Sequence, residues 1–352
     1  MIDYLNKKTY NFYLPENLIA TMPNYERDHC KLMVLNKNTG KIEHKFFFDI
    51  INYLNKNDIL VLNDSKVIPA RIYAKKDTGG NVEILLLNKI NNDESYWECL
   101  IKGKNIKKKD TLHLKFSDIK AIIENDNITT KLIRFSKALD SNILDSIGKI
   151  PLPPYIIQNR KKKGEKEYNN KDKEFYQNIY ARNYGSVASP TSGLHFTSEL
   201  LEKIKSIGVQ ICYITLHIGF STFNPLKDDD LRKHIMHEEM FIIEKESADM
   251  IINAKKYGRK IVSCGTTVAR VLESEYYNYS FKKLKGYTNI FIHPPYKFKC
   301  VDSLITNFHT PYSTLLAMVS AFAGYNNIMN AYKIAIDNNY RFFSYGDSMF
   351  IY

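Results

Sequence analysis

One segment of the 352-residue sequence combines hydroxyl groups, glycines, a proline and an imidazole, and most of its side chains are too small to form a core. The segment, residues 185–197, includes Thr191, Ser192, Gly193 and His195. Apolar residues at helical spacing follow, and Thr197 is placed to cap that helix. A helix start offers free backbone N–H groups to an anion and lowers the pKa of a nearby imidazole. We therefore expect an anion-binding loop with a neutral His195, although an ordinary capped turn is the simpler explanation of one such loop.

A polar loop that leads into a capped helix occurs at two further places in the sequence, which strengthens the functional interpretation. A strand at 260–264 runs into Gly265, after which Thr266 or Thr267 caps a helix. An apolar run at 301–305, interrupted by Asp302, leads to a helix with Thr310 as cap and Pro311 at its first position. Further polar residues follow these strands or open these helices, namely Arg270, Asn307, His309, Ser313 and Thr314. Two more strands, at 289–292 and 341–345, are followed by polar residues, and the second of these ends at Tyr345 before Asp347.

Alternating strands and helices predict an α/β fold with a mostly parallel sheet covered by helices. In such folds, ligands gather at the carboxyl ends of the strands. The polar clusters all fall at those ends, and so does the exit of an early strand, 58–62, into Asn63 and Asp64. Structural turns would scatter over both ends of a sheet, so the pattern favours one shared cleft.

Residues 69–150 have a different pattern, with short apolar stretches separated by turn residues and no helical periodicity. This pattern indicates a small antiparallel β-barrel, inserted into the α/β domain. The predicted organisation is an α/β domain formed by 1–68 and 151–352, interrupted by a barrel at 69–150. A lysine-rich stretch at about 160–174 also contains acidic residues, so we expect a solvated, mobile loop there.

The composition narrows the class of protein. No signal peptide or membrane-spanning stretch is evident, which predicts a cytoplasmic protein without a membrane partner. Five cysteines without a CxxC pair argue against a zinc site or a disulfide framework. The net charge of +12 is compatible with a polyanionic partner, although an AT-rich coding sequence would raise the lysine content in the same way. No protein partner is implied.

Ordered motifs along nearly the whole chain resemble one family, the S-adenosylmethionine:tRNA ribosyltransferase-isomerases of queuosine biosynthesis. The matching segments are 12–15, 18–20, 27–28, 61–71, 79–83, 150–155, 176–177, 180–181, 190–197, 215–219, 222–223, 234–241, 265–267, 270, 304–309, 313–316 and 341–347. The chain departs from the family pattern at several positions; for example, Cys30 and Lys31 stand where the pattern has Ser and Arg.

The resemblance implies a specific reaction. The ribosyl part of S-adenosylmethionine moves to the aminomethyl group of a deazaguanine at the tRNA wobble position, adenine and methionine leave, and an epoxide closes to give epoxyqueuosine. S-adenosylmethionine is thus a consumed cosubstrate, and no permanently bound cofactor or metal is expected. Such chemistry needs a base for a proton of the ribose methylene beside the sulfonium and an acid for the departing adenine.

The candidate acid and base are His195 and His217, with Asp302 and Glu239 as carboxylate alternatives. The sequence does not show which of them is the general acid and which the general base. The remaining predicted residues bind substrate: Asn63, Asp64, Arg71, Thr191, Ser192, Gly193, Thr266, Thr267, Arg270, Asn307, His309, Ser313, Thr314, Tyr345 and Asp347. Asn63, Asp64, Arg71 and Asp347 are equally explained as buried residues that hold loops. The run of histidines and glutamates at 234–239 lacks the helical spacing of a zinc protease, which disfavours a metal site.

For the nucleic acid, we expect a basic face that follows the anticodon arm of tRNA while the wobble base is splayed into the cleft against an aromatic ring. Phe308, Tyr312 and Tyr345 are candidates for that ring. Two other classes remain open. A different S-adenosylmethionine-dependent tRNA-modifying enzyme, such as a methyltransferase, would carry a glycine-rich turn that is not evident here. A non-catalytic RNA-binding protein would share the charge but has no need for five polar strand ends.

Overall fold

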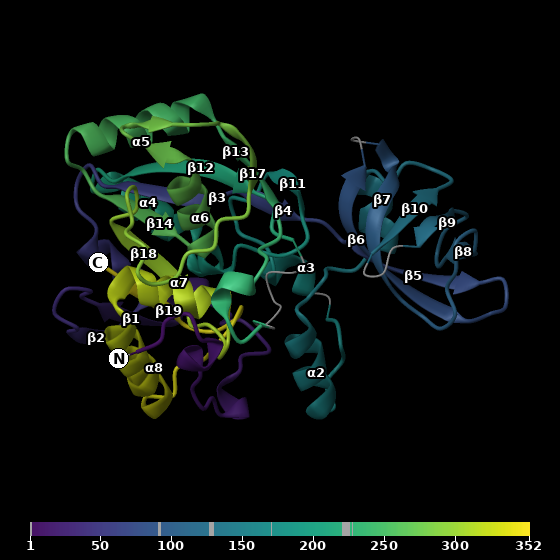
Figure 1. Ribbon diagram of the computed structural model, residues 1–352, viewed down its shortest axis with the longest axis horizontal. Coiled ribbons are helices and arrows are strands. Elements are labelled where there is room, and N and C mark those ends of the chain that lie inside the picture. Colours follow the sequence, from purple (N-terminus) through teal and green to yellow (C-terminus); the bar gives the residue numbers. More distant parts are fainter. Residues whose placement is uncertain (1, 91–92, 127–129, 170, 220–225, 227) are drawn as a thin grey trace.

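The computed structural model describes residues 2–90, 93–126, 130–169, 171–219, 226 and 228–352. Figure 1 shows two parts: a larger part in which helices cover a long sheet, and a smaller part of short strands that projects from one side of it. Both ends of the chain lie in the larger part.

Within the described residues, nine strands form the large sheet. Their spatial order is β17 (Lys285–Thr288), β13 (Glu239–Ile243), β12 (Gln210–Leu216), β3 (Ile59–Asn63), β14 (Ile261–Cys264), β18 (Ser303–Asn307), β19 (Ser348–Ile351), β1 (Lys31–Leu35) and β2 (Ile42–Phe46). The central strands β12, β3, β14 and β18 are parallel to one another. β1 is also parallel to β19, whereas β17–β13, β13–β12, β18–β19 and β1–β2 are antiparallel.

The sheet is therefore mixed, and the prediction of a mostly parallel sheet is not confirmed outside its centre. The connections explain the difference. A single helix between two strands returns the chain to the edge from which it started, which makes the strands parallel. Two successive helices, α7 (Thr314–Ala323) and α8 (Tyr325–Asp337), join β18 to β19, so the chain enters β19 from the other edge. A short turn joins β1 to β2 with the same effect.

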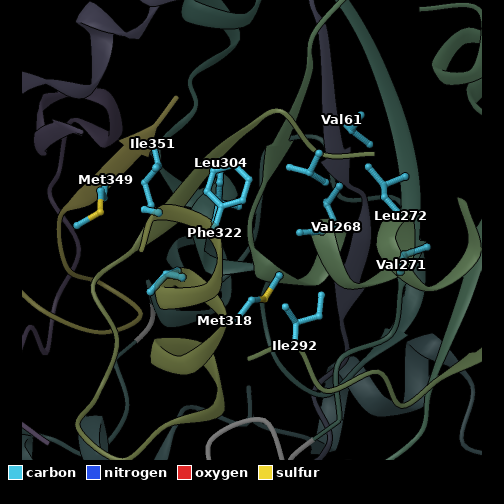
Figure 2. Packing of buried hydrophobic residues seen from close by; sticks show 14 of the residues in the cluster. Val61, Val268, Val271, Leu272, Ile292, Leu304, Met318, Phe322, Met349 and Ile351 are labelled. Atoms are coloured by element: carbon cyan, nitrogen blue, oxygen red, sulfur yellow. The ribbon is translucent and has the colours of Figure 1, made fainter. Parts of the chain in front are cut away.

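Helices pack on both faces of the sheet, which is why the central strands β3, β14 and β18 are buried along their whole length. Val61 faces a core shared with α5 (Lys245–Lys256), α6 (Thr266–Glu275), α7 and α8. The next residue, Leu62, faces the opposite core, formed with α4 (Ser198–Ser206). Figure 2 shows the first core, in which Val61 and Leu304 lie close to the α6 residue Val268 and the α7 residue Met318.

Several element ends differ from the sequence predictions. Thr197 caps α4 as predicted, and its side chain accepts a hydrogen bond from the Leu200 N–H. α6 is capped by Gly265 and not by a threonine, while Ser313, and not Thr310, caps α7. The strands predicted at 289–292 and 341–345 are wrong: β17 ends at Thr288, and the last strand lies at Ser348–Ile351.

The smaller part is a closed barrel, as predicted for this region. Its strands are β5 (Arg71–Lys76), β6 (Asn81–Ile90), β7 (Asp93–Lys102), β8 (Thr111–Leu114), β9 (Lys120–Asp126) and β10 (Lys131–Phe135). Every neighbouring pair is antiparallel, and an apolar core fills the interior. The domain boundaries at 69 and 150 stay a prediction.

Short elements connect the two parts and complete the fold. They are β4 (Ser65–Val67) with its partner β11 (Asn183–Ser186), the hairpin β15 (Tyr276–Tyr277) and β16 (Ser280–Phe281), helices α1 (Ser141–Ile147), α2 (Pro154–Lys162) and α3 (Asp172–Phe175), and 3-10 helices η1 (Lys7–Tyr10), η2 (Glu16–Leu18), η3 (Arg27–His29), η4 (Phe47–Tyr53), η5 (Thr191–His195) and η7 (Leu231–Lys233). No helix in the described ranges is long and apolar enough to cross a membrane.

The lysine-rich stretch near 160–174 is exposed over residues 161–167, as its composition predicts, but Arg160 and Asp172, near its two ends, are buried. Arg160 is 1% exposed, and its guanidinium donates two hydrogen bonds of 2.8 Å to the buried carboxylate of Asp172. A third bond, 3.2 Å long, reaches the Thr21 carbonyl. This buried ion pair fixes the start of α3 against α2 and the N-terminal segment, which a pattern of charges alone does not reveal.

Candidate active site

A cavity opens at the edge of the sheet where the central parallel strands end. It is lined by residues from widely separated segments, namely Tyr155, Ser189, Pro190, Thr191, Ser192, Ile218, Gly265, Thr266, Thr267, Asn307, Phe308, His309, Thr310, Ser313, Leu315, Phe343 and Ser344. Among them are seven predicted site residues: Thr191, Ser192, Thr266, Thr267, Asn307, His309 and Ser313. The polar strand ends therefore converge, as the sequence pattern indicates.

Gly265 allows two of these segments to meet. Its φ of +95° is a backbone conformation that residues with a side chain rarely adopt, and it turns the chain sharply from β14 into α6. A Cβ atom at this position would also lie 3.4 Å from the Ser192 hydroxyl oxygen. Because that distance is an ordinary van der Waals contact, the positive φ, and not a lack of space, is what favours glycine at this turn.

His195 lies behind the cavity and contacts it through Asn307. Its imidazole is 5% exposed, with Nε2 3.3 Å from Asn307 Oδ1 and Nδ1 3.1 Å from the Cys30 sulfur. Burial lowers the pKa of His195 to about 4, so the ring is neutral at pH 7, as predicted. The cause is desolvation, and not the helix start that the sequence analysis invoked.

The hydrogen-bond partners of Asn307 show which nitrogen of the His195 imidazole carries the proton. The Asn307 amide nitrogen donates to the carbonyl of Phe343 at 3.1 Å and of Ser344 at 3.4 Å, so Oδ1 must face His195 as an acceptor. His195 Nε2 therefore carries the proton, and Nδ1 accepts from the Cys30 thiol. Burial raises the pKa of Cys30 well above its usual value, which keeps the thiol protonated and able to donate.

His309 is the predicted histidine that lines the cavity itself. Its Nε2 lies 3.0 Å from the Thr306 hydroxyl, and its backbone N–H donates to the Tyr332 hydroxyl at 2.9 Å. Burial lowers the pKa of His309 to about 3. A neutral imidazole is thus fixed at the end of β18, beside the starts of α6 and α7.

His217 and its neighbours form a separate polar group beside β12. Buried Asp64 accepts hydrogen bonds from Arg182 Nε (2.7 Å), Asn183 Nδ2 (3.1 Å) and Thr215 Oγ1 (2.6 Å). His217 Nδ1 is buried and has no hydrogen-bond partner among the described residues, while its ring lies against Gly185. Burial lowers the pKa of His217 and nearby Asp64 opposes that shift. The next residue of the chain, Ile218, lines the cavity, whereas His217 and Asp64 do not.

Asn63 belongs to the same region and links it to the cavity. Its side-chain oxygen accepts the backbone N–H groups of Ser65 and Leu216, both at 3.1 Å. Its amide nitrogen donates to the Leu216 carbonyl at 3.1 Å and lies 3.4 Å from the Thr267 hydroxyl. Asn63 therefore fixes the exits of β3 and β12 relative to the start of α6.

Glu239 and Arg270 form a buried ion pair at the outer side of α6. Both side chains are at most 5% exposed, and the Glu239 carboxylate also accepts the Gly219 N–H at 3.0 Å. Arg270 Nε donates to the Ile290 carbonyl at 3.3 Å. Neither side chain lines the cavity. A carboxylate engaged in this way orients its neighbours.

Other predicted site residues lie away from the cavity. Asp302 precedes β18 at the opposite edge of the sheet, where it pairs with Lys255, so it does not belong with the other candidates. Arg71 pairs with Glu83 in the barrel, and Asp347 accepts the backbone N–H groups of Lys31 and Arg341. Three more predicted residues do not line the cavity: Gly193, which packs against Tyr180 and Asn178, Thr314, which begins α7, and Tyr345, which is buried against Tyr176.

Of the three aromatic residues predicted for the cavity, only Phe308 lines it. Phe308 lines the cavity but is fully buried, and its ring packs against Tyr332, Tyr340 and Phe342. Tyr312 and Tyr345 do not line it. Tyr155 and Phe343 do, and the sequence analysis missed them because it placed Phe343 in a strand and used Tyr155 only as a family motif.

The histidines and glutamates at 234–239 do not form a metal centre in the part of the chain that the structure describes, where no three potential ligands cluster. The ring of His234 instead lies 5.3 Å from that of Phe291. All five cysteines are free and buried.

Comparisons with known proteins agree with this arrangement. The family model described as "Queuosine biosynthesis protein" matches residues 7–351. A curated S-adenosylmethionine:tRNA ribosyltransferase-isomerase from a Sulfurihydrogenibium species is 48% identical over 344 residues, 97% of this chain and 98% of that protein. The enzyme of the same name from a Thermoanaerobacter species is 46% identical over 352 residues, 99% of this chain and 100% of that one.

A solved structure is also similar to this chain. The crystal structure of an S-adenosylmethionine tRNA ribosyltransferase from Thermotoga maritima superposes with a TM-score of 0.55 at 35% identity, covering 98% of this chain and 100% of that one. Fold, convergent cavity and near full-length similarity point the same way: the chain belongs to the queuosine biosynthesis protein family.

Proposed function

We propose that this protein is an S-adenosylmethionine:tRNA ribosyltransferase-isomerase. It transfers and isomerises the ribosyl part of S-adenosylmethionine onto the aminomethyl-deazaguanine of tRNA to give epoxyqueuosine, with release of adenine and methionine. The observation that carries this proposal is the convergence of three polar loop-to-helix segments on one cavity in a chain of this family.

The helix starts at the cavity suit the methionine part of the cosubstrate. α6 and α7 each run for ten residues and begin at the cavity, with Thr266, Thr267 and Ser313 lining it. Free N–H groups and the dipoles of both helices favour a carboxylate there. Hydroxyl groups of Thr191 and Ser192 on the facing loop are suited to the ribose.

The neighbouring imidazoles supply the candidates for proton transfer. His309 lines the cavity and is the imidazole best placed to meet the substrate. Both ring nitrogens of His195 are engaged, so we assign it a positioning role exerted through Asn307. His217 Nδ1 has no hydrogen-bond partner among the described residues, but His217 does not line the cavity.

The nucleic acid partner is tRNA, and we propose that its anticodon arm delivers the wobble nucleotide to the cavity. The net charge of +12 supports binding to a phosphate backbone. The base must leave its stack to reach a cavity of this kind, as it does in other enzymes that modify bases. A cytoplasmic location stays the prediction from the sequence.

Incubation of the purified protein with S-adenosylmethionine and tRNA that carries the aminomethyl-deazaguanine tests the function. We expect adenine and methionine in equal amounts, together with modified tRNA. Release of S-adenosylhomocysteine would instead identify a methyltransferase. Tight tRNA binding without any turnover would identify a non-catalytic RNA-binding protein, and either result would overturn the proposal.

A further inference from the structure

Tyr155 and Phe343 form one side of the cavity, and we call this pair the aromatic wall. Both side chains are half-buried, and their ring centroids lie 4.7 Å apart with an interplanar angle of 45°. Tyr155 belongs to α2, whereas Phe343 follows α8, so the fold brings two distant aromatic residues together at a polar cavity. Planar rings that remain partly exposed in a cavity offer a face to another planar ring.

The backbone of Phe343 is held in an unusual conformation. Its φ is +74°, a region that a bulky side chain rarely occupies and that recurs at active sites and ligand clamps. Its N–H donates to the Phe308 carbonyl at 3.0 Å, and its carbonyl accepts the Asn307 amide at 3.1 Å. Because Asn307 is itself oriented by His195, the buried Cys30–His195–Asn307 chain fixes the position of the wall.

A hydroxyl group with no partner adjoins the same side of the cavity. Ser189 lines the cavity and is 4% exposed, and its Oγ has no hydrogen-bond partner among the described residues. Ser344, next to the wall, donates its backbone N–H to the Tyr155 hydroxyl at 2.8 Å. Ser189 and Ser344 both lie next to Tyr176, where each slightly opposes the effect of burial on the pKa of that phenol. A buried hydroxyl without a partner indicates that a ligand atom completes its hydrogen bonding.

We propose that the aromatic wall stacks on a purine-type base and that Ser189 hydrogen-bonds to the edge of that base. An aromatic face with one polar group at its rim is the usual way in which proteins hold a single nucleobase. The inference deepens the proposed function, because that reaction brings two such bases to the cavity: the adenine of the cosubstrate and the deazaguanine of tRNA.

Phe343→Leu tests the wall, since it keeps an apolar side chain and removes the ring. Loss of stacking is expected to weaken binding of the base about tenfold. Phe343→Tyr keeps the ring and should restore binding. Phe48→Leu, at an exposed aromatic residue of η4 outside the cavity, is the matched control and should bind as the unaltered protein does.

Binding is measured without turnover, by equilibrium dialysis with S-adenosylmethionine and by filter binding with tRNA that carries the aminomethyl-deazaguanine. Weaker binding of S-adenosylmethionine alone assigns the wall to adenine, and weaker binding of the tRNA alone assigns it to the wobble base. Ser189→Ala should weaken the same ligand. If Phe343→Leu is folded and binds both ligands normally, the wall proposal is wrong. Failure of the proposed function would show instead as intact binding without release of adenine.

Discussion

Polar residues lie at both ends of the central parallel strands, but among the described residues only those at one end have all their hydrogen bonds within the protein. Where β18 begins, the Asp302 carboxylate accepts hydrogen bonds from Lys255 Nζ at 3.0 Å and from the Ile261 N–H at 2.8 Å. Where β18 ends, Ser189 Oγ has no partner among the described residues, and His309 lines an open cavity. Groups satisfied within the protein stabilise the fold, whereas groups that lack a partner are available to a ligand.

The largest expected effect comes from His195. His195→Ala leaves Asn307 Oδ1 buried without its donor, and the Phe343 backbone loses its support. This should lower kcat/KM for adenine release about 30-fold, or about 2 kcal/mol of transition-state stabilisation, because Asn307 and Phe343 no longer hold their positions in the site. His195→Gln places an amide donor where Nε2 lies and should recover most of that loss.

Adenine release by the two variants is compared at equal protein concentration, with their unfolding temperatures as a control for folding. Recovery in the glutamine variant would mean that His195 acts by positioning Asn307. Equal loss in both folded variants would show that the imidazole itself transfers a proton, and the division of roles between His195 and His309 would be wrong.

The buried histidines also predict how stability depends on pH. The pKa of His195 is about 4 in the folded protein and about 6.5 in an unfolded chain. The unfolded state therefore binds a proton more readily, so this contribution to stability is complete above pH 6.5 and is lost as the pH falls towards 4. At pH 5 the loss from His195 is about 2 kcal/mol.

Denaturant unfolding at pH 7 and pH 5 checks this, with His195→Gln as the reference. The comparison needs that variant because burial raises the pKa of Asp347, which acts on stability in the opposite direction. The decrease between the two pH values should be about 2 kcal/mol larger in the unaltered protein than in the variant. An equal decrease in both proteins would contradict a neutral, buried His195.

The sequence predicts the cavity well because the carboxyl ends of parallel strands must meet. Thr266 and Asn307 follow strands that lie next to each other in the sheet, so their proximity follows from the alternation of strands and helices. The barrel is equally predictable, since its short strands and turns carry a local pattern.

Other features depend on contacts that no local pattern encodes. The antiparallel entry of β19 results from two helices in place of one. The sequence pattern predicts the last strand at 341–345, ahead of its observed position. The wall residue Phe343 owes its position to a positive φ and to the Asn307 amide. Asp302 was misassigned because a polar residue at the beginning of a strand resembles one at its end unless the strand boundary is known to within one residue.

The smallest effect is expected at the satisfied edge of the sheet. Asp302→Asn removes the charge that pairs with Lys255 and keeps an oxygen for the Ile261 N–H. The Asp302 side chain is 34% exposed, so solvent screens the pair and the loss of stability should be only about 1 kcal/mol. Adenine release should not change, because Asp302 lies across the sheet from the cavity.

A double-mutant cycle with Lys255→Met, measured by denaturant unfolding, isolates the contribution of the Asp302–Lys255 ion pair to stability. A large fall in turnover of the folded Asp302→Asn protein would mean that the two edges are coupled and would remove the distinction drawn between them.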